Sequence, residues 1–199
     1  MERGPRTERS LETGTMSIRR PDPRHPGGET PLEDDPLASA YWIRSFRRDD
    51  AREVRELVFG VLEEFGLAPD QAGTDVDLSD VELHYQARGG GFWVVENGRG
   101  RIVGTCGLWL DPGDPARCEL RKMYLRPDWR GRGLGGQLLQ TALDHARAAG
   151  RRAVELETNR AMTAAIGLYE SRGFHEIEGE TCARCDRRFT LELVEKERT

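Results

Sequence analysis

The sequence predicts an α/β fold of the α+β type, in which a central mixed, mostly antiparallel sheet is flanked by helices. Strand-like and helix-like patterns alternate along the chain from Tyr41 onward. An Asn97-Gly98 pair joins two apolar runs, which is a strong signal for an antiparallel hairpin. Further on, a glycine-rich turn opens a long helix between two strands, which indicates one β-α-β unit.

Composition limits the kind of protein. The 199 residues suit one well-buried domain, and the net charge of -5 gives no electrostatic case for binding nucleic acid. No apolar stretch approaches the ~20 residues of a membrane span. The N-terminus also lacks the apolar segment of a secretory signal. We therefore expect a cytoplasmic protein with no membrane and no nucleic-acid partner.

Residues 1–40 differ from the rest of the chain. They contain no aromatic residue and six of the ten prolines. Such a segment cannot bury enough apolar surface to offset the entropy lost on ordering. We predict a disordered N-terminal extension over 1–40 and one folded domain over 41–199.

The folded part begins with a strand and a helix. Residues 41–46 have the composition of a strand, and a helix follows over 49–66, capped by Asp49 or Asp50 and ended by Gly66. A short helix is expected over 77–86, with Ser79 or Asp77 as its cap. The apolar face of the first helix comprises Val54, Leu57, Val58, Val61 and Leu62.

The same hydrophobic periodicity and glycine stops predict the remaining helices and strands of the domain. Helices are expected over 134–150 and 161–173, ended by Gly150 and Gly173. The remaining strands are expected over 91–96, 101–110, 118–125, 152–158, 174–179 and 187–194.

The turn before the helix at 134–150 carries Gly131, Gly133 and Gly136 in a G-x-G-x-x-G pattern. Unpaired N–H groups and the positive end of a helix dipole bind phosphate there, while a tight turn with solvated arginines is the plain alternative. A dinucleotide-binding loop is excluded by context, because residues 126–130 separate the glycines from their strand and too little chain follows. A Walker loop is excluded because no Gly-Lys-Ser or Gly-Lys-Thr follows.

Two motifs together resemble a known family. Arg130-Gly131-Arg132-Gly133-Leu134-Gly135 resembles the R/Q-x-x-G-x-G/A signature of the GNAT superfamily of N-acetyltransferases. Residues 165–174 resemble its second signature, a helix carrying a tyrosine followed by Gly-Phe. The order of elements from Tyr41 to about Glu195 also fits, so the resemblance covers the folded domain and implies a GNAT-type fold.

The resemblance implies acetyl-coenzyme A as co-substrate. The pyrophosphate would rest on backbone amides of the glycine loop, and the pantetheine arm would lie along the central strand. Many family members carry an asparagine seven residues before the signature tyrosine; Met162 stands there, and Asn159 is the candidate substitute. The cofactor-binding residues so expected are Met123, Tyr124, Leu125, Arg130, Gly131, Arg132, Gly133, Leu134, Gly135, Gly136 and Asn159.

Two residues are candidates for catalysis. Tyr169 is the expected proton donor to the departing thiolate, against the alternative of a tyrosine packed at the helix edge. Glu119 is the candidate general base on the central strand, where strict alternation places it on one face with Arg121 and Met123. A structural pair of Glu119 with Arg121 or Lys122 is equally open, and a chain of water molecules could replace a dedicated base.

Acidic and sulfur-containing residues allow further expectations. Asp75, Asp77, Asp80 and Glu82 either cap a helix, the favoured interpretation, or form a negative rim that selects cationic amines. Cys182 and Cys185 form an isolated C-x-x-C without two further zinc ligands. We expect ordinary thiols in a hairpin turn and no metal.

The expected function is transfer of an acetyl group from acetyl-coenzyme A to a primary amine, by direct transfer in a ternary complex. A catalytically idle coenzyme A-binding regulatory module is the alternative. The acceptor is a small-molecule or peptide amine that the sequence does not name. A homodimer is also open, because an edge strand or the closing hairpin could pair with a second copy.

Overall fold

The fold is taken from a computed structural model that describes residues 39–193. The predicted disorder of residues 1–38 and the predicted end of the domain beyond 193 therefore lie outside the described residues. No helix among residues 39–193 is long and apolar enough to cross a membrane.

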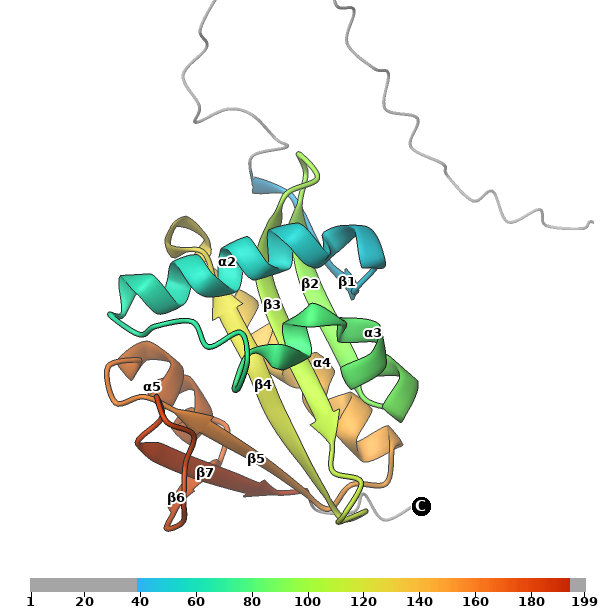
Figure 1. The fold of residues 1–199 in the computed structure, drawn as a ribbon, viewed down its shortest axis with the longest axis vertical. Coiled ribbons are helices and arrows are strands. Elements are labelled where there is room, and N and C mark those ends of the chain that lie inside the picture. The colour runs from blue at the N-terminus through green and yellow to red at the C-terminus, as the bar shows by residue number, and fades with distance from the viewer. Residues whose placement is uncertain (1–38, 194–199) are drawn as a thin grey trace, which may run out of the picture. The chain divides into compact units, whose positions relative to one another are not determined.

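Seven strands form one sheet in the order β1-β2-β3-β4-β5-β7-β6 (Figure 1). Neighbouring strands are antiparallel except β4 and β5, which are parallel. This confirms the predicted mixed, mostly antiparallel sheet with one β-α-β unit. The strands are β1 Tyr41–Ser45, β2 Gly91–Asn97, β3 Ile102–Leu110, β4 Arg117–Leu125, β5 Ala153–Thr158, β6 His175–Ile177 and β7 Arg187–Glu192.

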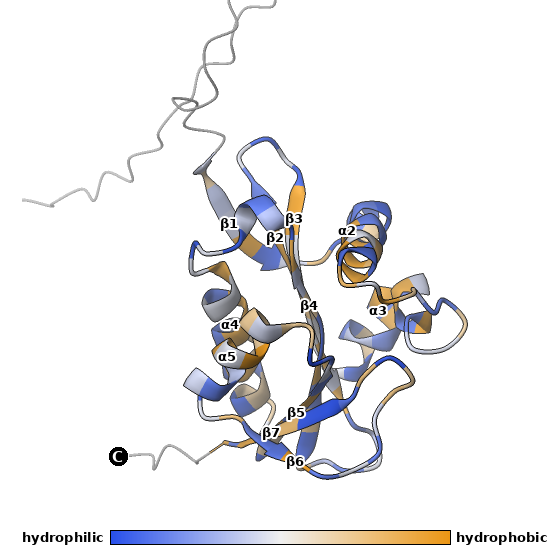
Figure 2. Cartoon of the chain, turned by 90° about the vertical axis from the view of Figure 1, so that its left-hand side faces the viewer, coloured by the Kyte–Doolittle hydropathy of each residue, from blue (hydrophilic) through white to orange (hydrophobic). Residues whose placement is uncertain are grey.

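Helices cover both faces of the sheet (Figure 2). One face carries α2 (Ala51–Glu64) and the short α3 (Val81–His84), and the other carries α4 (Leu134–Ala148) and α5 (Thr163–Ser171). Each face has its own apolar cluster, so the sheet separates two cores. Short 3-10 turns lie at Arg48–Asp50, Val76–Ser79, Gln86–Arg88 and Pro127–Trp129.

The two long helices form for the predicted reasons. The five predicted apolar residues of α2 are buried, and Gly66 follows the helix with a positive φ of 69° that favours glycine. Helix α4 buries one stripe against the sheet, and Gly150 follows it with a φ of 70°. That stripe comprises Leu134, Leu138, Leu139, Ala142, Leu143 and Ala146.

The short helix differs from its prediction. The expected element divides into the 3-10 turn Val76–Ser79 and α3, and Asp80 is the cap, because its side chain accepts the N–H of Leu83 at 2.9 Å. The predicted caps, Ser79 and Asp77, are wrong for a physical reason. Asp77 is buried and accepts the hydroxyl of Tyr85 at 2.5 Å, and the Ser79 hydroxyl donates to a carbonyl within its own turn.

Strand β4 contains a bulge that the alternation argument did not foresee. The register against β3 shifts between Thr105 and Gly107, and Lys122 adopts a φ of 51°, in the left-handed region. After the bulge the faces exchange. Met123 packs in the cluster of α4 and α5, whereas Arg121 stacks on Trp109 on the opposite face. The prediction that Glu119, Arg121 and Met123 share a face is therefore wrong.

Strands β4 and β5 pair only at their beginnings, from Arg117–Ala153 to Leu120–Leu156. Beyond that point they diverge: in Figure 1 they lie together at the lower right and separate toward the left. The end of β4 that carries Met123, Tyr124 and Leu125 thus has no strand neighbour on its β5 side. This divergence creates the space in which both cavities described below lie.

Candidate active site

The first cavity, here called the apolar cavity, has a volume of about 430 Å³ and lies where the end of β4 meets the starts of α4 and α5. That size lies within the range of small-molecule sites, roughly 300–1,000 Å³. Nine of the expected cofactor-binding residues line it: Met123, Tyr124, Leu125, Arg130, Gly131, Gly133, Leu134, Gly135 and Gly136. The glycine loop and the central strand therefore come together as predicted.

The start of α4 presents a row of unused hydrogen-bond donors. The backbone N–H groups of residues 131–136 have no hydrogen-bond acceptor among residues 39–193. Gly133, the N-cap, has a φ of 77°, and the first turn of the helix carries no acidic side chain. Open space surrounds the position that a Cβ would take at Gly131 and Gly133. Such an end has the donors, dipole and access that an anion requires.

The arginines of this region differ in what they can contribute. Arg130 lines the apolar cavity, but its guanidinium is paired with both carboxylate oxygens of Glu64, at 2.6 and 2.8 Å. Arg132 stacks on Trp129 and does not line the cavity. Arg172, which the sequence reasoning missed, places a guanidinium nitrogen 2.8 Å from where a Cβ of Gly136 would stand. Like Arg132 it does not line the cavity, but its guanidinium lies beside the first turn of α4.

The second cavity, here called the charged cavity, has a volume of about 280 Å³ and lies on the other side of the β4–β5 divergence. Both acids and bases line it, in contrast to the apolar cavity. Its walls comprise Thr74, Glu119, Leu120, Arg121, Lys122, Met123, Tyr124, Glu157, Thr158, Met162, Tyr169, Cys182, Arg184 and Cys185. The predicted base thus lies in a cavity distinct from the glycine loop.

Tyr169 lines both cavities and lies where they adjoin. Its side chain is buried, and we find no hydrogen-bond partner for its hydroxyl among residues 39–193. Burial raises the pKa of this hydroxyl above its usual value, so the phenol keeps its proton at neutral pH. Met123, Tyr124 and Met162 are the other residues that line both cavities.

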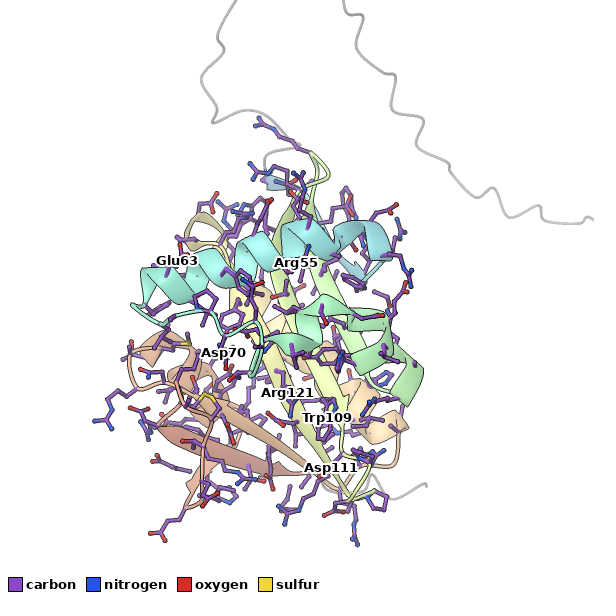
Figure 3. The ribbon with its side chains drawn as sticks, viewed as in Figure 1. Arg55, Glu63, Asp70, Trp109, Asp111 and Arg121 are labelled. Atoms are coloured by element: carbon purple, nitrogen blue, oxygen red, sulfur yellow. A yellow bond between two sulfur atoms is a disulfide. The ribbon has the colours of Figure 1, made fainter. Side chains whose placement is uncertain are left out.

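Glu119 combines both interpretations left open by the sequence. Its carboxylate is paired with Arg121, whose guanidinium lies 4.4 Å from the Trp109 ring centroid, and it also lines the charged cavity. Figure 3 labels Arg121 and Trp109 side by side on this face. Glu157 is a second carboxylate of the cavity, and it accepts the N–H of Cys182 at 2.8 Å.

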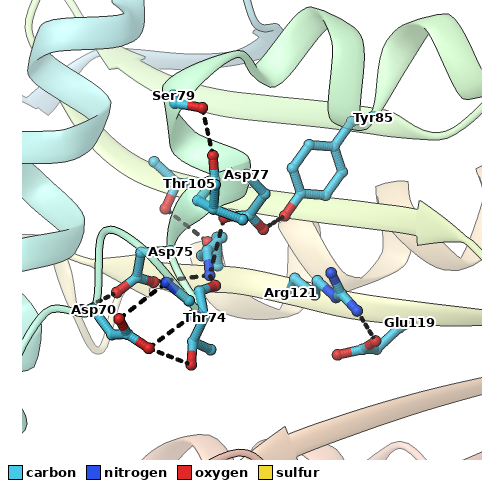
Figure 4. A network of polar contacts seen from close by, with 12 residues as sticks. Asp70, Thr74, Asp75, Asp77, Ser79, Tyr85, Thr105, Glu119 and Arg121 are labelled. Carbon is cyan, nitrogen blue, oxygen red and sulfur yellow. Dashed lines mark hydrogen bonds and ion pairs between the residues drawn. The ribbon is translucent and has the colours of Figure 1, made fainter.

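A buried ionic network forms the wall behind the charged cavity (Figure 4). The Lys122 Nζ lies 2.9 Å from Asp75 and 3.2 Å from Asp77, and it donates to the carbonyl of Thr74 at 2.7 Å. Arg184 binds Asp75 through two bonds of 2.5 and 2.6 Å. Asp75 and Asp77 are therefore neither helix caps nor an exposed negative rim, which corrects both interpretations of the acidic loop for these two residues.

Charge pairing controls ionisation in this network. Burial alone would raise the pKa of Asp75, but hydrogen bonds from Arg184 and Lys122 outweigh it and lower the pKa to about 2. Burial raises the pKa of Tyr124, on the same wall, to about 12. Both groups are thus fixed in one protonation state near neutral pH.

The cysteine prediction is corrected. Cys182 and Cys185 are joined by a disulfide rather than present as free thiols, while Cys106 and Cys118 are free and buried. The bridge is drawn in yellow in Figure 3. With Glu157, the two sulfurs form a group of potential metal ligands within 4.8 Å of one another. In the disulfide form, however, neither sulfur is a thiolate that could bind a metal.

Asn159 does not line either cavity. Its side chain donates to the carbonyl of Arg184 at 2.9 Å and accepts the N–H of Ala161 at 3.0 Å. Both bonds organise the loop before α5. Met162, which stands where many family members have an asparagine, lines both cavities instead.

Comparison with solved structures identifies the class of fold. The domain superposes with a TM-score of 0.73 on a GNAT-family acetyltransferase of Staphylococcus aureus Mu50, at 24% identity, covering 78% of this chain and 100% of the other. It also superposes, with a TM-score of 0.64 and 23% identity, on yncA, a putative acetyltransferase of Salmonella typhimurium with its cofactor acetyl-CoA, covering 79% and 96% of the two chains. The domain therefore shares its fold with these two solved structures.

Sequence comparison adds evidence on the family to which the chain belongs. Residues 56–174 match the model of the acetyltransferase (GNAT) family. The chain is 35% identical over 139 residues to the uncharacterized N-acetyltransferase YjgM of Escherichia coli K12, covering 68% of this chain and 83% of that one. It is also 37% identical over 105 residues to N-acetyltransferase 8 of Rattus norvegicus. That match covers 50% of this chain and 46% of the relative. The chain belongs to the GNAT family.

Besides Arg172, three residues that line the charged cavity escaped the sequence reasoning: Lys122, Arg184 and Glu157. Lys122 offered a signal, since it is the one lysine of residues 39–193 in a chain whose other cations there are arginines. Arg184 and Asp75 offered none, because 109 positions separate them and only the fold brings them together.

Proposed function

We propose that the protein transfers the acetyl group of acetyl-coenzyme A to a primary amine, directly, within a ternary complex. The observation that carries the proposal is the arrangement of two adjoining cavities. One ends on the unused amides of α4, the other holds carboxylates, and Tyr169 lies between them. Acetyl-coenzyme A supplies a thioester whose carbonyl carbon the amine attacks.

The apolar cavity fits the donor. The amides of residues 131–136 receive the pyrophosphate, with the open space at Gly131 and Gly133 allowing close approach. Because Arg130 is neutralised by Glu64, Arg172 is the better source of positive charge beside Gly136. The side of Met123–Leu125 that has no strand neighbour offers backbone groups to the amides of the pantetheine arm.

The charged cavity fits the acceptor. An amine enters as an ammonium with a pKa near ~10, so it must lose a proton before it can attack. Glu119 and Glu157, on the two diverging strands, stabilise the cation, and Glu119 accepts its proton. Among the described residues, Glu157 has no ion-pair partner, and it therefore has a charge to offer to an ammonium.

Tyr169 protonates the departing thiolate. In water this transfer is uphill by about 2 kcal/mol, because a phenol (pKa about 10) is a weaker acid than a thiol (about 8.5). Inside the protein the thiolate is destabilised as well. Burial raises the pKa of the nearby Cys106 thiol and that of the Tyr169 hydroxyl, so these surroundings disfavour thiolate and phenolate alike. A protonated, otherwise unbonded Tyr169 hydroxyl is therefore a suitable donor.

The test is release of free thiol from acetyl-coenzyme A in the presence of a panel of amines, amino acids and peptides. Release that depends on the acceptor, with a product heavier by one acetyl group, supports direct transfer. Tight binding of coenzyme A without release on a broad panel favours the idle regulatory module instead. Absence of coenzyme A binding contradicts both.

A further inference from the structure

The disulfide of Cys182 and Cys185 closes a four-residue turn between β6 and β7. A bridge over so short a loop removes little entropy from the unfolded chain, so stabilisation is a weak reason for it. Other bonds already hold the turn. Cys185 donates its N–H to the Cys182 carbonyl at 2.9 Å, and the Thr181 hydroxyl donates to the Cys185 carbonyl at 2.8 Å.

The Arg184 side chain joins the bridged turn to a distant segment of the chain. Arg184 stands between the two cysteines and extends to Asp75, which it binds through both nitrogens. Asp75 is fully buried and also holds Lys122 of β4. The turn is therefore connected through Arg184 to the loop before α3 and to the central strand.

This turn belongs to one cavity and not to the other. Cys182, Arg184 and Cys185 all line the charged cavity, and none of them lines the apolar cavity. Both sulfurs belong to partly exposed residues, whereas Cys106 and Cys118 are buried, with thiol pKa values raised by burial. Thiol chemistry is therefore confined to the wall of the charged cavity.

We propose that Cys182 and Cys185 are a reversible dithiol–disulfide site for low-molecular-weight thiols and disulfides, and that its oxidation state sets acceptor affinity through Arg184. In the oxidising direction the S–S bond of a small disulfide breaks, the Cys182–Cys185 bond forms, and the two cysteine protons pass to the two small thiols released. Reduction reverses each step.

The oxidation state of the turn changes the affinity for the acceptor and not the affinity for coenzyme A. In the disulfide form the turn fixes Arg184 on Asp75, and the wall of the charged cavity is ordered. Reduction removes the covalent closure and leaves the turn with its hydrogen bonds alone. The two-bond contact of Arg184 with Asp75 is then less tightly fixed, and the acceptor binds more weakly. Coenzyme A is unaffected, because its proposed cavity has no contact with the turn. The acceptor half of this inference rests on the proposed function.

The first test needs no acceptor. The full chain is equilibrated with oxidised or reduced glutathione, and intact mass follows the 2 Da that separate the two forms. Hydrogen–deuterium exchange then compares residues 70–78 with α4. We expect exchange in 70–78 to be at least about fivefold faster in the reduced form, with α4 unchanged. Failure to form the disulfide, or equal exchange in both forms, overturns the proposal.

Two variants sharpen the test. Cys182→Ser should give the fast exchange under both conditions, and Arg184→Lys, which keeps the charge but loses the two-bond geometry, should do the same with a normal melting curve. A slow, wild-type-like rate in Arg184→Lys contradicts the role of Arg184.

For any amine that supports thiol release, reduction should raise its KM about fivefold and leave the KM for acetyl-coenzyme A unchanged. If coenzyme A does not bind but the exchange difference appears, the proposed function fails and the redox site stands.

Discussion

Tyr169 is the residue at which the two cavities adjoin, and the proposed function makes its hydroxyl the proton donor to the leaving thiolate. We predict that Tyr169→Phe lowers kcat about 100-fold, because it removes the proton for the leaving thiolate and little else. The KM for acetyl-coenzyme A should stay within about twofold. Steady-state thiol release measures both constants.

The matched control is Tyr41→Phe, since Tyr41 lines neither cavity and its hydroxyl only accepts a bond from Gln137. It should retain wild-type kcat. Equal losses in both variants would mean that the effect at Tyr169 is structural.

Glu119 is the second residue with a proposed chemical role. We expect Glu119→Gln to lower kcat/KM for the amine about 10- to 100-fold and to leave only the pH dependence of the free amine itself. A pH–rate profile of both proteins measures this, with the exposed Glu192→Gln as control. An unchanged profile would assign deprotonation to a chain of water molecules instead.

At the scale of elements, the start of α4 is where sequence and structure agree best. The glycine loop could be interpreted from sequence because its consequence is local: glycines permit a positive φ, and the first turn of a helix leaves amides unpaired. The bulge at Lys122 is the opposite case. A left-handed lysine follows from the register of β3 against β4 and from its buried carboxylate partners, none of which the pattern of β4 contains.

The unused amides of residues 131–136 at the start of α4, here called the α4 cradle, lead to a prediction about Gly133. A Cβ at Gly133 meets no protein atom, but it occupies a left-handed residue and extends into the space proposed for the pyrophosphate. Gly133→Ala should therefore cost only about 1–2 kcal/mol of stability while weakening coenzyme A binding at least about tenfold, measured by calorimetric titration. Gly60→Ala is the control, because Gly60 lies exposed in α2 with open space around it. It should leave the affinity unchanged, and an equal loss of affinity in both variants would remove the argument for the cradle.

At the scale of the whole molecule, the network around Asp75 joins three distant segments: the loop before α3, strand β4 and the β6–β7 turn. We predict that Asp75→Asn lowers the free energy of unfolding by about 3 kcal/mol at pH 7, because it leaves Arg184 and Lys122 short of a buried partner. Denaturant unfolding of both proteins measures the difference.

The same network gives an acid limit to stability. The pKa of Asp75 is depressed in the folded protein, so its contribution is complete above the ordinary value near 4 and is lost as the pH falls to about 2. The gap between wild type and Asp75→Asn should therefore close over that window. The exposed Asp128→Asn should differ little from wild type throughout. A gap that persists at pH 2 would show that the Asp75 charge is not what stabilises the fold.

The order of elements, the cores and most of the proposed donor site could be predicted because each depends on a short segment and its periodicity. The acceptor side could not. Its walls combine β4, β5, the loop before α3 and the β6–β7 turn, and their contacts depend on a fold in which Asp75 meets Arg184.

The most direct test of the proposed function is a crystal structure of the protein with coenzyme A. We predict the pyrophosphate on the amides of residues 131–136, the pantetheine arm along Met123–Leu125, and the sulfur within hydrogen-bonding distance of the Tyr169 hydroxyl. Coenzyme A bound elsewhere, or with its sulfur away from Tyr169, would contradict the proposed acetyl transfer at this site.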